Sequence, residues 1–233
     1  MDITQFWTIC SANSIILTLE QLKSFERYRD ELIYWNAKVN LISRKDEENI
    51  FERHFLHSLA ILKYVKIRSK SKCLDIGTGG GFPGLPIKIA NPEINMMLID
   101  SIRKKVKLTE MFAQHTGLRK IEVATIRAED LAIGTKEFIQ FDFIMARAVS
   151  SIKNIVDWSY KFLSDSGLYV LLKGGDLTDE IAELKQAYPS MKVREHLIDM
   201  YGCDSFKKDE KKIVIIGKRS LEMNDKVLRQ NKE

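Results

Sequence analysis

The chain has 233 residues, of which 45% are hydrophobic and 30% are charged, and this is enough for one α/β core with a modest extension. No apolar run approaches the ~20 residues that a membrane-spanning helix needs, and no basic segment leads into a long apolar one at the N-terminus, so we expect a cytoplasmic protein with no membrane association. The 37 Lys and Arg against 32 Asp and Glu give a net charge of +5, which permits an anionic partner without requiring one.

The first 66 residues have helical patterns. Apolar residues recur at helical spacing between residues 19 and 39, namely Leu19, Leu22, Phe25, Leu32, Trp35 and Val39. A second predicted helix begins at Asp46 or Glu47 and ends at Tyr64. These apolar stripes need a partner surface, so we expect residues 1–66 to form a helical extension that packs on the following domain.

Residues 67–219 alternate between strand and helix patterns. We predict strands at 72–76, 95–100, 121–126, 141–147, 168–173, 193–199 and 211–218. Helical patterns separate the first five strands, as right-handed crossovers between parallel strands require. The last two strands are consistent with an antiparallel hairpin at the sheet edge, joined by a basic loop around Lys207. Residues 220–233 have the composition of a charged C-terminal tail.

The first predicted strand leads directly into a loop of glycines, Gly77-Thr78-Gly79-Gly80-Gly81, followed by Phe82. Without side chains the backbone can adopt positive φ, and a ligand can approach the main-chain amides. The next predicted strand ends at Asp100, 21 residues after Gly79, where a Rossmann-like fold places an acid against a ribose. Together, the two features indicate a cofactor that contains a nucleoside.

Several cofactor classes use such a loop. A G-x-x-x-x-G-K-[ST] pattern is absent, which disfavours a nucleotide-phosphate loop. Gly79, Gly81 and Gly84 satisfy G-x-G-x-x-G, so an NAD-dependent oxidoreductase stays open, although this pattern is displaced by two residues from the strand end. The pattern D-x-G-x-G-x-G, which starts at Asp75, favours S-adenosylmethionine.

Ligands of parallel sheets bind at the carboxyl ends of the strands, so the residues there are further candidates. Ala128 and Glu129 follow the third strand, where a turn beside an adenine and the acidic first turn of a helix look the same in sequence. Arg147 ends the fourth strand, either as a buried ion-pair partner or as a site residue, and its position favours the site. Lys173 ends the fifth strand in the same layer. The alternative is that Lys173 only marks the point where this strand reaches solvent.

Several segments together resemble the RsmG (GidB) family of bacterial 16S rRNA methyltransferases. They are Leu74–Pro86, Leu98–Ser101 with Lys104 and Lys105, Ala146–Ala148 and Leu172–Gly174, and upstream Trp35-Asn36, Asn40-Leu41 and Arg53-His54 with Ser58. The resemblance covers roughly residues 20–218. Two positions depart from the family pattern: His57 stands where the family usually has Asp in R-H-x-x-D-S, and Phe82 where Leu is common.

This resemblance implies a Rossmann-like class I S-adenosylmethionine-dependent methyltransferase with a mostly parallel seven-stranded sheet, acting on N7 of a guanine in 16S rRNA of the small ribosomal subunit. It also implies that S-adenosylmethionine binds at Gly77, Phe82, Ala128, Glu129 and Arg147. Thr78, Gly79, Gly81 and Asp100 join this set from the loop and strand-end logic above. The candidate catalytic residues are Arg147 and Lys173, which would hold the target phosphate or the guanine O6 edge. We expect no metal and a monomer.

The chain lacks the residues of two other methylation chemistries. Cys10, Cys73 and Cys203 are far apart without C-x-x-C spacing, which argues against disulfides and zinc. None of them follows the fourth strand, where pyrimidine C5 methylation would need a cysteine nucleophile. Exocyclic amine methylation commonly uses an N-P-P-[YF] motif there, whereas this chain has Ala146-Arg147-Ala148. Guanine N7 carries a lone pair and no proton, so its methylation needs no general base.

Basic residues cluster in three places, around 68–72, 103–107 and 207–212. A solvated face is the simplest interpretation of any one cluster, but the last two could contact RNA phosphates. A loop guanine would have to leave its stack to reach the pocket. The alternatives to this function are an NAD-dependent oxidoreductase, a non-catalytic RNA-binding module, and methylation of another RNA, a protein or a small molecule.

Overall fold

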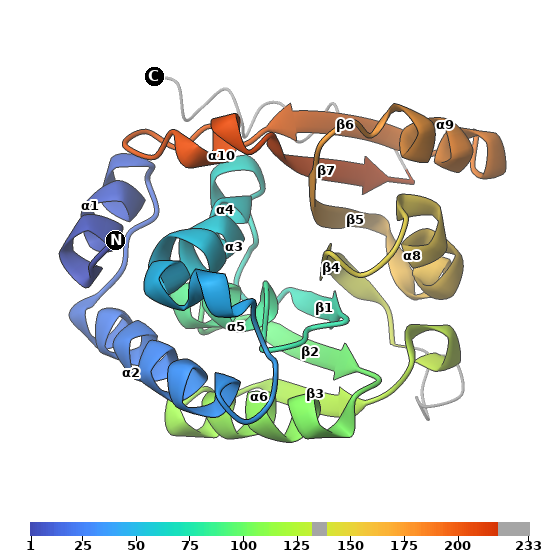
Figure 1. Ribbon diagram of the computed structural model, residues 1–233. Helices are drawn as coiled ribbons and strands as arrows, with labels where there is room; N and C mark the ends of the chain where they lie inside the picture. The colour runs from blue at the N-terminus through green and yellow to red at the C-terminus, as the bar shows by residue number, and fades with distance from the viewer. Residues whose placement is uncertain (132–138, 219–233) are drawn as a thin grey trace.

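The computed structural model describes residues 1–131 and 139–218 (Figure 1). A seven-stranded sheet with the order β3-β2-β1-β4-β5-β7-β6 forms its centre. The strands are β1 (Lys72–Ile76), β2 (Asn95–Asp100), β3 (Ile121–Thr125), β4 (Phe141–Arg147), β5 (Leu163–Gly174), β6 (Lys192–Leu197) and β7 (Lys211–Gly217). The strands β1 to β5 pair in parallel, so the predicted mostly parallel sheet is confirmed.

The last two strands form the predicted antiparallel pair at the sheet edge, joined by the connection that contains Lys207. Strand β7 lies between β5 and β6 and is antiparallel to both, so β6 alone occupies that edge. Their sequences explain the arrangement, because β7 contributes a continuous buried run over 213–217, whereas β6 is only partly buried. The sequence of a strand that is paired on both sides and covered on both faces is an unbroken apolar run.

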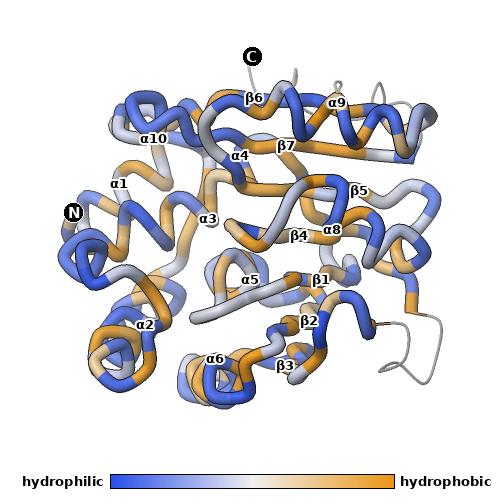
Figure 2. The backbone as a smooth tube through the Cα atoms, turned by 45° about the vertical axis from the view of Figure 1, so that its right-hand side comes forward, coloured by the Kyte–Doolittle hydropathy of each residue, from blue (hydrophilic) through white to orange (hydrophobic). Residues whose placement is uncertain are grey.

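Alternation along the strands builds two cores, one on each face of the sheet. Met96 and Leu98 belong to one cluster, whereas Met97 and Ile99 belong to the other, as a period of two requires. The first face is covered by α5 (Gly84–Ala90), α6 (Arg103–His115) and the N-terminal helices, and the second by α8 (Ile152–Ser159) and α9 (Thr178–Ala187). Figure 2 shows the apolar strands inside this sandwich and the mixed colouring of the helices around it.

The N-terminal region begins with two helices, α1 (Ile3–Ala12) and α2 (Leu19–Asn36). A capping box starts each of them, at Asp2 and at Thr18, and satisfies backbone amides that have no partner within the helix. The predicted stripe of α2 is buried in its middle, although Leu19, in the first turn, is 66% exposed. Side chains of both helices share one apolar cluster with α5 and α6, while the boundaries 1–66, 67–219 and 220–233 stay a prediction.

The second predicted helix exists but is not continuous. It consists of a 3-10 segment η1 (Arg44–Asn49), a π-helical segment η2 (Phe51–Leu56) and two short helices, α3 (His57–Leu59) and α4 (Ile61–Tyr64). The hydroxyl of Ser58 donates to the carbonyl of His54 at 2.6 Å inside this segment. The π-helical segment η2 carries His54, which contacts Arg147 at the end of β4. Turns of this kind are frequent at functional sites.

The remaining short elements are η3 (Ala128–Asp130), η4 (Tyr160–Phe162) and α10 (Ser205–Lys208). Part of the crossover predicted between the third and fourth strands, and the predicted tail at 220–233, lie outside the described residues. Strand order reverses between β1, which continues to β2, and β4, which continues to β5. In an open parallel sheet this reversal opens a crevice at the carboxyl ends of the strands, where ligands bind.

Candidate functional site

The glycine loop follows β1 at this crevice, and its backbone requires glycine. Gly77, Gly79 and Gly81 have φ of 66°, 59° and 105°. A Cβ at Gly77 would lie 2.6 Å from a methyl carbon of Val149, and one at Gly81 would lie 2.6 Å from the hydroxyl of Tyr28. Positive φ and close packing therefore exclude larger residues at both positions.

Asp75 organises this loop from below. It is buried at the end of β1, and its Oδ2 accepts hydrogen bonds from the Thr78 hydroxyl at 2.7 Å and from the Gly84 amide at 2.9 Å. Burial raises the pKa of Asp75 from 3.8 to about 7, although both hydrogen bonds oppose this shift. The two bonds join the start of the loop to the start of α5, so Asp75 shapes the loop without reaching solvent.

Asp100 ends β2 and is joined directly to the glycine loop. One carboxylate oxygen accepts from the Gly79 amide at 2.9 Å, and the other accepts from the Ile102 amide at 2.8 Å. The Thr109 hydroxyl donates to the Gly79 carbonyl at 2.9 Å from α6. Each carboxylate oxygen can accept more than one bond, so Asp100 retains capacity for a ligand hydroxyl at the loop.

The segment after β3 lies next to the end of β2. The Ile126 amide donates to the Asp100 carbonyl at 3.1 Å, which holds the chain that leads to Ala128 and Glu129 beside that strand end. Ala128 is half-buried and Glu129 is exposed, and both lie on η3. Their backbone amides and the Glu129 carboxylate are therefore placed at the carboxyl edge, as candidate ligand groups would be.

Arg147 leaves the end of β4 and contacts residues from two other parts of the chain, the η2 segment and the glycine loop. One guanidinium NH2 donates to Nδ1 of His54 at 2.8 Å, and the other donates to the Arg53 carbonyl at 3.3 Å. The guanidinium carbon lies 4.7 Å from the centre of the Phe82 ring, within the range of a cation–π interaction. Burial lowers the pKa of Arg147 from 12.5 to about 10, so the group keeps its charge at neutral pH.

Phe82 is only 2% exposed, and the loop presents it to the N-terminal helices. Its ring stacks on Tyr28 with centroids 5.6 Å apart and lies 5.0 Å from the ring of His54. The Tyr28 hydroxyl donates to the carbonyl of Gly80. The extension thus supports the glycine loop directly, and Phe82 joins it to Arg147.

A pocket of about 370 Å³ opens beside Arg147, between the ends of β4 and β5, the η2 and α3 segment, and α10 with the start of β7. Its lining includes Arg53, His54, His57, Arg147, Leu172, Lys173, Phe206 and Lys211, together with the carboxylates of Asp46, Glu52 and Asp209. Volumes of about 300–1,000 Å³ are usual for small-ligand sites. The pocket adjoins the glycine loop through the contact between Arg147 and Phe82.

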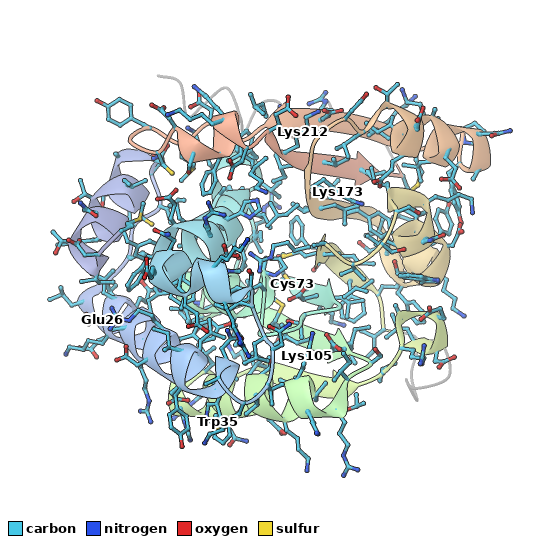
Figure 3. All side chains as sticks on the ribbon, in the orientation of Figure 1. Glu26, Trp35, Cys73, Lys105, Lys173 and Lys212 are labelled. Carbon is cyan, nitrogen blue, oxygen red and sulfur yellow. The ribbon has the colours of Figure 1, made fainter. Side chains whose placement is uncertain are left out.

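Lys173, labelled in Figure 3, belongs to the lining of this pocket, and its ammonium already has partners. Its Nζ lies 2.8 Å from a Glu180 oxygen and 2.6 Å from the Ser150 carbonyl. The same Glu180 oxygen accepts the Ile152 amide at the start of α8, at 2.8 Å. Lys173 therefore fixes the loop after β4, which carries Ala148 at a φ of 54°.

Two histidines of the pocket were not singled out as site residues from the sequence. Burial, reinforced by the charge of Arg147, lowers the pKa of His54 from 6.5 to about 3 and that of His57 well below 6.5, so both rings are neutral at pH 7. Since Nδ1 of His54 accepts from Arg147, its proton lies on Nε2, which is 3.3 Å from Asp46. The available signal was two histidines, His54 and His57, among the apolar residues Phe51, Phe55, Leu56 and Leu59 of the second predicted helix.

Cys10, Cys73 and Cys203 are buried free thiols. Within residues 1–131 and 139–218, no group of three or more His, Cys, Asp or Glu is arranged to hold a metal ion. Within the same residues, no helix is long and apolar enough to cross a membrane.

Solved structures with little sequence similarity have the same fold. The precorrin-6y C5,15-methyltransferase of Geobacter metallireducens matches with a TM-score of 0.54 at 11% identity, over 78% of this chain and 92% of that one. The YcgJ protein of Bacillus subtilis matches with a TM-score of 0.53 at 17% identity, over 71% of this chain and 100% of that one. The predicted Rossmann-like class I methyltransferase fold is confirmed.

Relatives with clear sequence similarity carry one name, ribosomal RNA small subunit methyltransferase G. The protein of Cytophaga hutchinsonii is 39% identical over 205 residues, covering 85% of this chain and 93% of that protein. The protein of Bacteroides thetaiotaomicron is 42% identical over 176 residues, covering 72% and 82%. The model of the GidB family, described as rRNA small subunit methyltransferase G, matches residues 21–208. The resemblance drawn from the sequence is confirmed, and the chain belongs to the rRNA small subunit methyltransferase G (GidB) family.

Proposed function

We propose that this protein transfers a methyl group from S-adenosylmethionine to N7 of a guanine in the 16S rRNA of the small ribosomal subunit. The observation that carries the proposal is the family match over residues 21–208, a range that includes the glycine loop, Asp100, Arg147 and Lys173. The relatives' name supplies the small-subunit rRNA as substrate class. The choice of N7 comes from the family resemblance and from the chemistry below.

The glycine loop fits the cofactor. Around the Cβ position of Gly79 the nearest atom is the Gly77 carbonyl oxygen at 4.0 Å, so a ligand can approach this stretch of backbone. Gly77, Thr78, Gly79 and Gly81 would line the methionine portion, and Asp100 would accept from the ribose hydroxyls. Ala128 and Glu129 would meet the adenine, and Arg147 the methionine carboxylate. Phe82 would support this arrangement from beneath the loop.

N7 methylation suits the groups that surround the pocket. When bound, the cofactor supplies an electrophilic methyl group on a sulfonium. Guanine N7 attacks through its lone pair without losing a proton, so the neutral His54 and His57 need not act as bases. Arg147 would orient the acceptor, because its planar fork makes paired contacts to O6 or a phosphate. Alignment of this kind contributes up to ~7–11 kcal/mol to lowering a barrier.

The partner, oligomeric state and compartment belong to the same proposal. We propose that the protein works as a monomer on the small ribosomal subunit, in the cytoplasm, and without a metal ion. Arg103, Lys104 and Lys107 begin α6 at the carboxyl edge of the sheet, where they could contact RNA phosphates. Lys207 and Lys212, in contrast, form ion pairs with Asp199 at 2.9 Å and Glu195 at 2.6 Å.

Transfer of labelled methyl groups tests the proposal. The purified protein is incubated with labelled S-adenosylmethionine and with unmethylated small subunits, free 16S rRNA, tRNA or bulk protein in separate reactions. We expect label in the 16S rRNA of one or both ribosomal substrates. Label in tRNA, in protein or in a small molecule instead would move the activity to the alternative substrate classes.

A further inference from the structure

His57 lies in the wall of the 370 Å³ pocket, and its Nε2 has no hydrogen-bond partner among the described residues. The side chain is 7% exposed, and its ring packs against Phe206 with centroids 5.3 Å apart. The Nε2 atom is itself buried. A neutral imidazole always carries one N–H donor and one lone pair. The ring of His57 can therefore form a hydrogen bond that the described residues do not provide.

The charges of the pocket select the kind of ligand. The cationic groups of Arg53, Arg147, Lys211 and Lys173, the last paired with Glu180, share the lining with the carboxylates of Asp46, Glu52 and Asp209. A phosphate would meet repulsion from these carboxylates, and a cation would meet it from the basic groups. A neutral ring with both donors and acceptors on its edges matches the mixture. Guanine has this character, with acceptors at O6 and N7 and donors at N1 and N2.

Neighbouring groups add shape to this selection. Leu172 and Phe206 supply apolar surface for a flat ring, and Arg147 reaches from this pocket to Phe82 of the glycine loop. A base here would therefore lie between the end of β5 and the proposed cofactor, close to the place where methyl transfer must occur. A nucleotide in a loop can enter such a pocket only after it leaves its stack.

We propose that this pocket receives the unstacked guanine and that the imidazole of His57 hydrogen-bonds a polar edge of the base, as a specificity-determining residue. This inference rests on the proposed function and goes further by assigning the acceptor pocket and a residue within it. Arg147 borders both the base and the cofactor, whereas His57 contacts the base alone. The binding of S-adenosylhomocysteine is therefore independent of His57.

Matched substitutions separate hydrogen bonding from packing. His57→Phe keeps a ring against Phe206 but removes both nitrogens, and His57→Gln keeps a polar end of similar reach. His115→Phe makes the same change on α6, at a residue outside the pocket lining that pairs with Glu31 at 2.8 Å. We expect His57→Phe to lower kcat/KM for the ribosomal substrate about 10- to 100-fold, the size expected for one buried hydrogen bond.

The same assay has defined outcomes against the proposal. His57→Gln should recover part of the loss, affinity for S-adenosylhomocysteine should be unchanged in all three variants, and His115→Phe should match the wild type. Wild-type kinetics in His57→Phe would overturn the assignment. So would a loss that His57→Gln shares in full together with a lowered Tm, because packing alone would then explain it.

A spectroscopic test needs no turnover. The chain has only four histidines, so ¹⁵N spectra of their rings are simple, and the His57 signals are assigned by their loss in His57→Phe. Guanosine 5′-monophosphate, added to the complex with S-adenosylhomocysteine, should shift the His57 signals, while those of His115 stay in place and cytidine 5′-monophosphate has no effect. Unmoved His57 signals overturn the pocket assignment even if the wild type methylates 16S rRNA. Failure of the proposed function, in contrast, is already evident in the wild-type transfer assay.

Discussion

At the scale of single residues, Arg147 connects the most parts of the site. It ends β4, donates to His54 at 2.8 Å and lies 4.7 Å from the Phe82 ring, so it touches the pocket and the glycine loop at once. A lysine can keep the charge but cannot reproduce the planar fork that makes these contacts together. The position therefore depends on guanidinium geometry as well as on charge.

We predict that Arg147→Ala and Arg147→Lys both lower kcat/KM for methyl transfer about 10- to 100-fold, as expected for the loss of charged hydrogen bonds. Steady-state kinetics with ribosomal particles measure the change, and circular dichroism checks that the fold persists. Arg119→Ala, at an exposed arginine after α6, is the control and should behave as the wild type. Full activity in Arg147→Lys would show that charge alone suffices.

Asp75 gives a prediction on pH. Burial raises its pKa to about 7 in the folded state, so folding favours the protonated carboxyl. This contribution to stability is fully present below the unfolded pKa of about 3.9 and is lost as pH rises through about 7. With one pKa unit worth about 1.4 kcal/mol, its upper limit is about 4 kcal/mol.

Urea denaturation at pH 5 and pH 8 measures this effect. Asp75→Asn keeps an amide oxygen for Thr78 and Gly84 but cannot ionise, so the wild type should lose more free energy of unfolding between these pH values than the variant does. His54 titrates in the opposite direction, since its lowered pKa removes stability as pH falls from 6.5, and it is common to both proteins. Parallel pH profiles would contradict the role given to Asp75.

At the scale of elements, α2 and the glycine loop act as a unit. Tyr28 is buried, donates to the Gly80 carbonyl and stacks on Phe82 with an interplanar angle of 18°. Its position 52 residues before Gly80 makes the N-terminal extension a structural support of the loop. Substitutions that disturb α2 are therefore expected to weaken cofactor binding at the glycine loop.

We predict that Tyr28→Phe lowers the free energy of unfolding by about 1–3 kcal/mol, because it leaves a buried carbonyl without its partner while keeping the ring. Weaker binding of S-adenosylhomocysteine should accompany this loss, which calorimetry can measure. Tyr34→Phe is the control on the same helix, because Tyr34 is 58% exposed. Unchanged affinity for S-adenosylhomocysteine in Tyr28→Phe would contradict a role of α2 in supporting the glycine loop.

The sequence predicted elements well where the signals were local. Gly79 and Asp100 lie 21 residues apart, and a hydrogen bond of 2.9 Å from the Gly79 amide to Asp100 joins them, while the predicted contact of Asp100 with a ribose stays a prediction. The contact between His54 and Arg147 spans 93 residues, and it depends on how the broken second helix packs. Periodicity identified that helix but could not reveal its π-helical turn.

At the scale of the whole molecule, sheet order was harder to predict than strand number. An antiparallel pair at the end of the chain allows either β6 or β7 to lie next to β5, and periodicity alone does not separate the two. Burial decides in favour of β7, because the run from Ile213 to Ile216 needs cover on both faces. The family resemblance supplied the substrate class, which neither composition nor spacing contains.

Charge distribution over the molecule gives a prediction on RNA binding. Among the described residues, Lys104 and Lys107 on α6 have no ion-pair partner, whereas Lys207 is neutralised by Asp199. Lys104→Glu combined with Lys107→Glu should raise KM for ribosomal particles and weaken its dependence on salt, with kcat nearly unchanged. Lys207→Glu should have the smaller effect. A larger effect on KM from Lys207→Glu than from the double substitution would assign the RNA contact to the segment before β7.

The central claim is methylation of one guanine N7 in 16S rRNA, and the chemistry of the product tests it most directly. N7-methylguanosine becomes labile after borohydride reduction, and aniline then cleaves the RNA chain at that nucleotide. Small subunits treated with the wild-type protein and S-adenosylmethionine should yield a single new cleavage in 16S rRNA, which Arg147→Ala greatly reduces. Methyl label in the RNA without any such cleavage would contradict the claim, because the methyl group would then be on another atom.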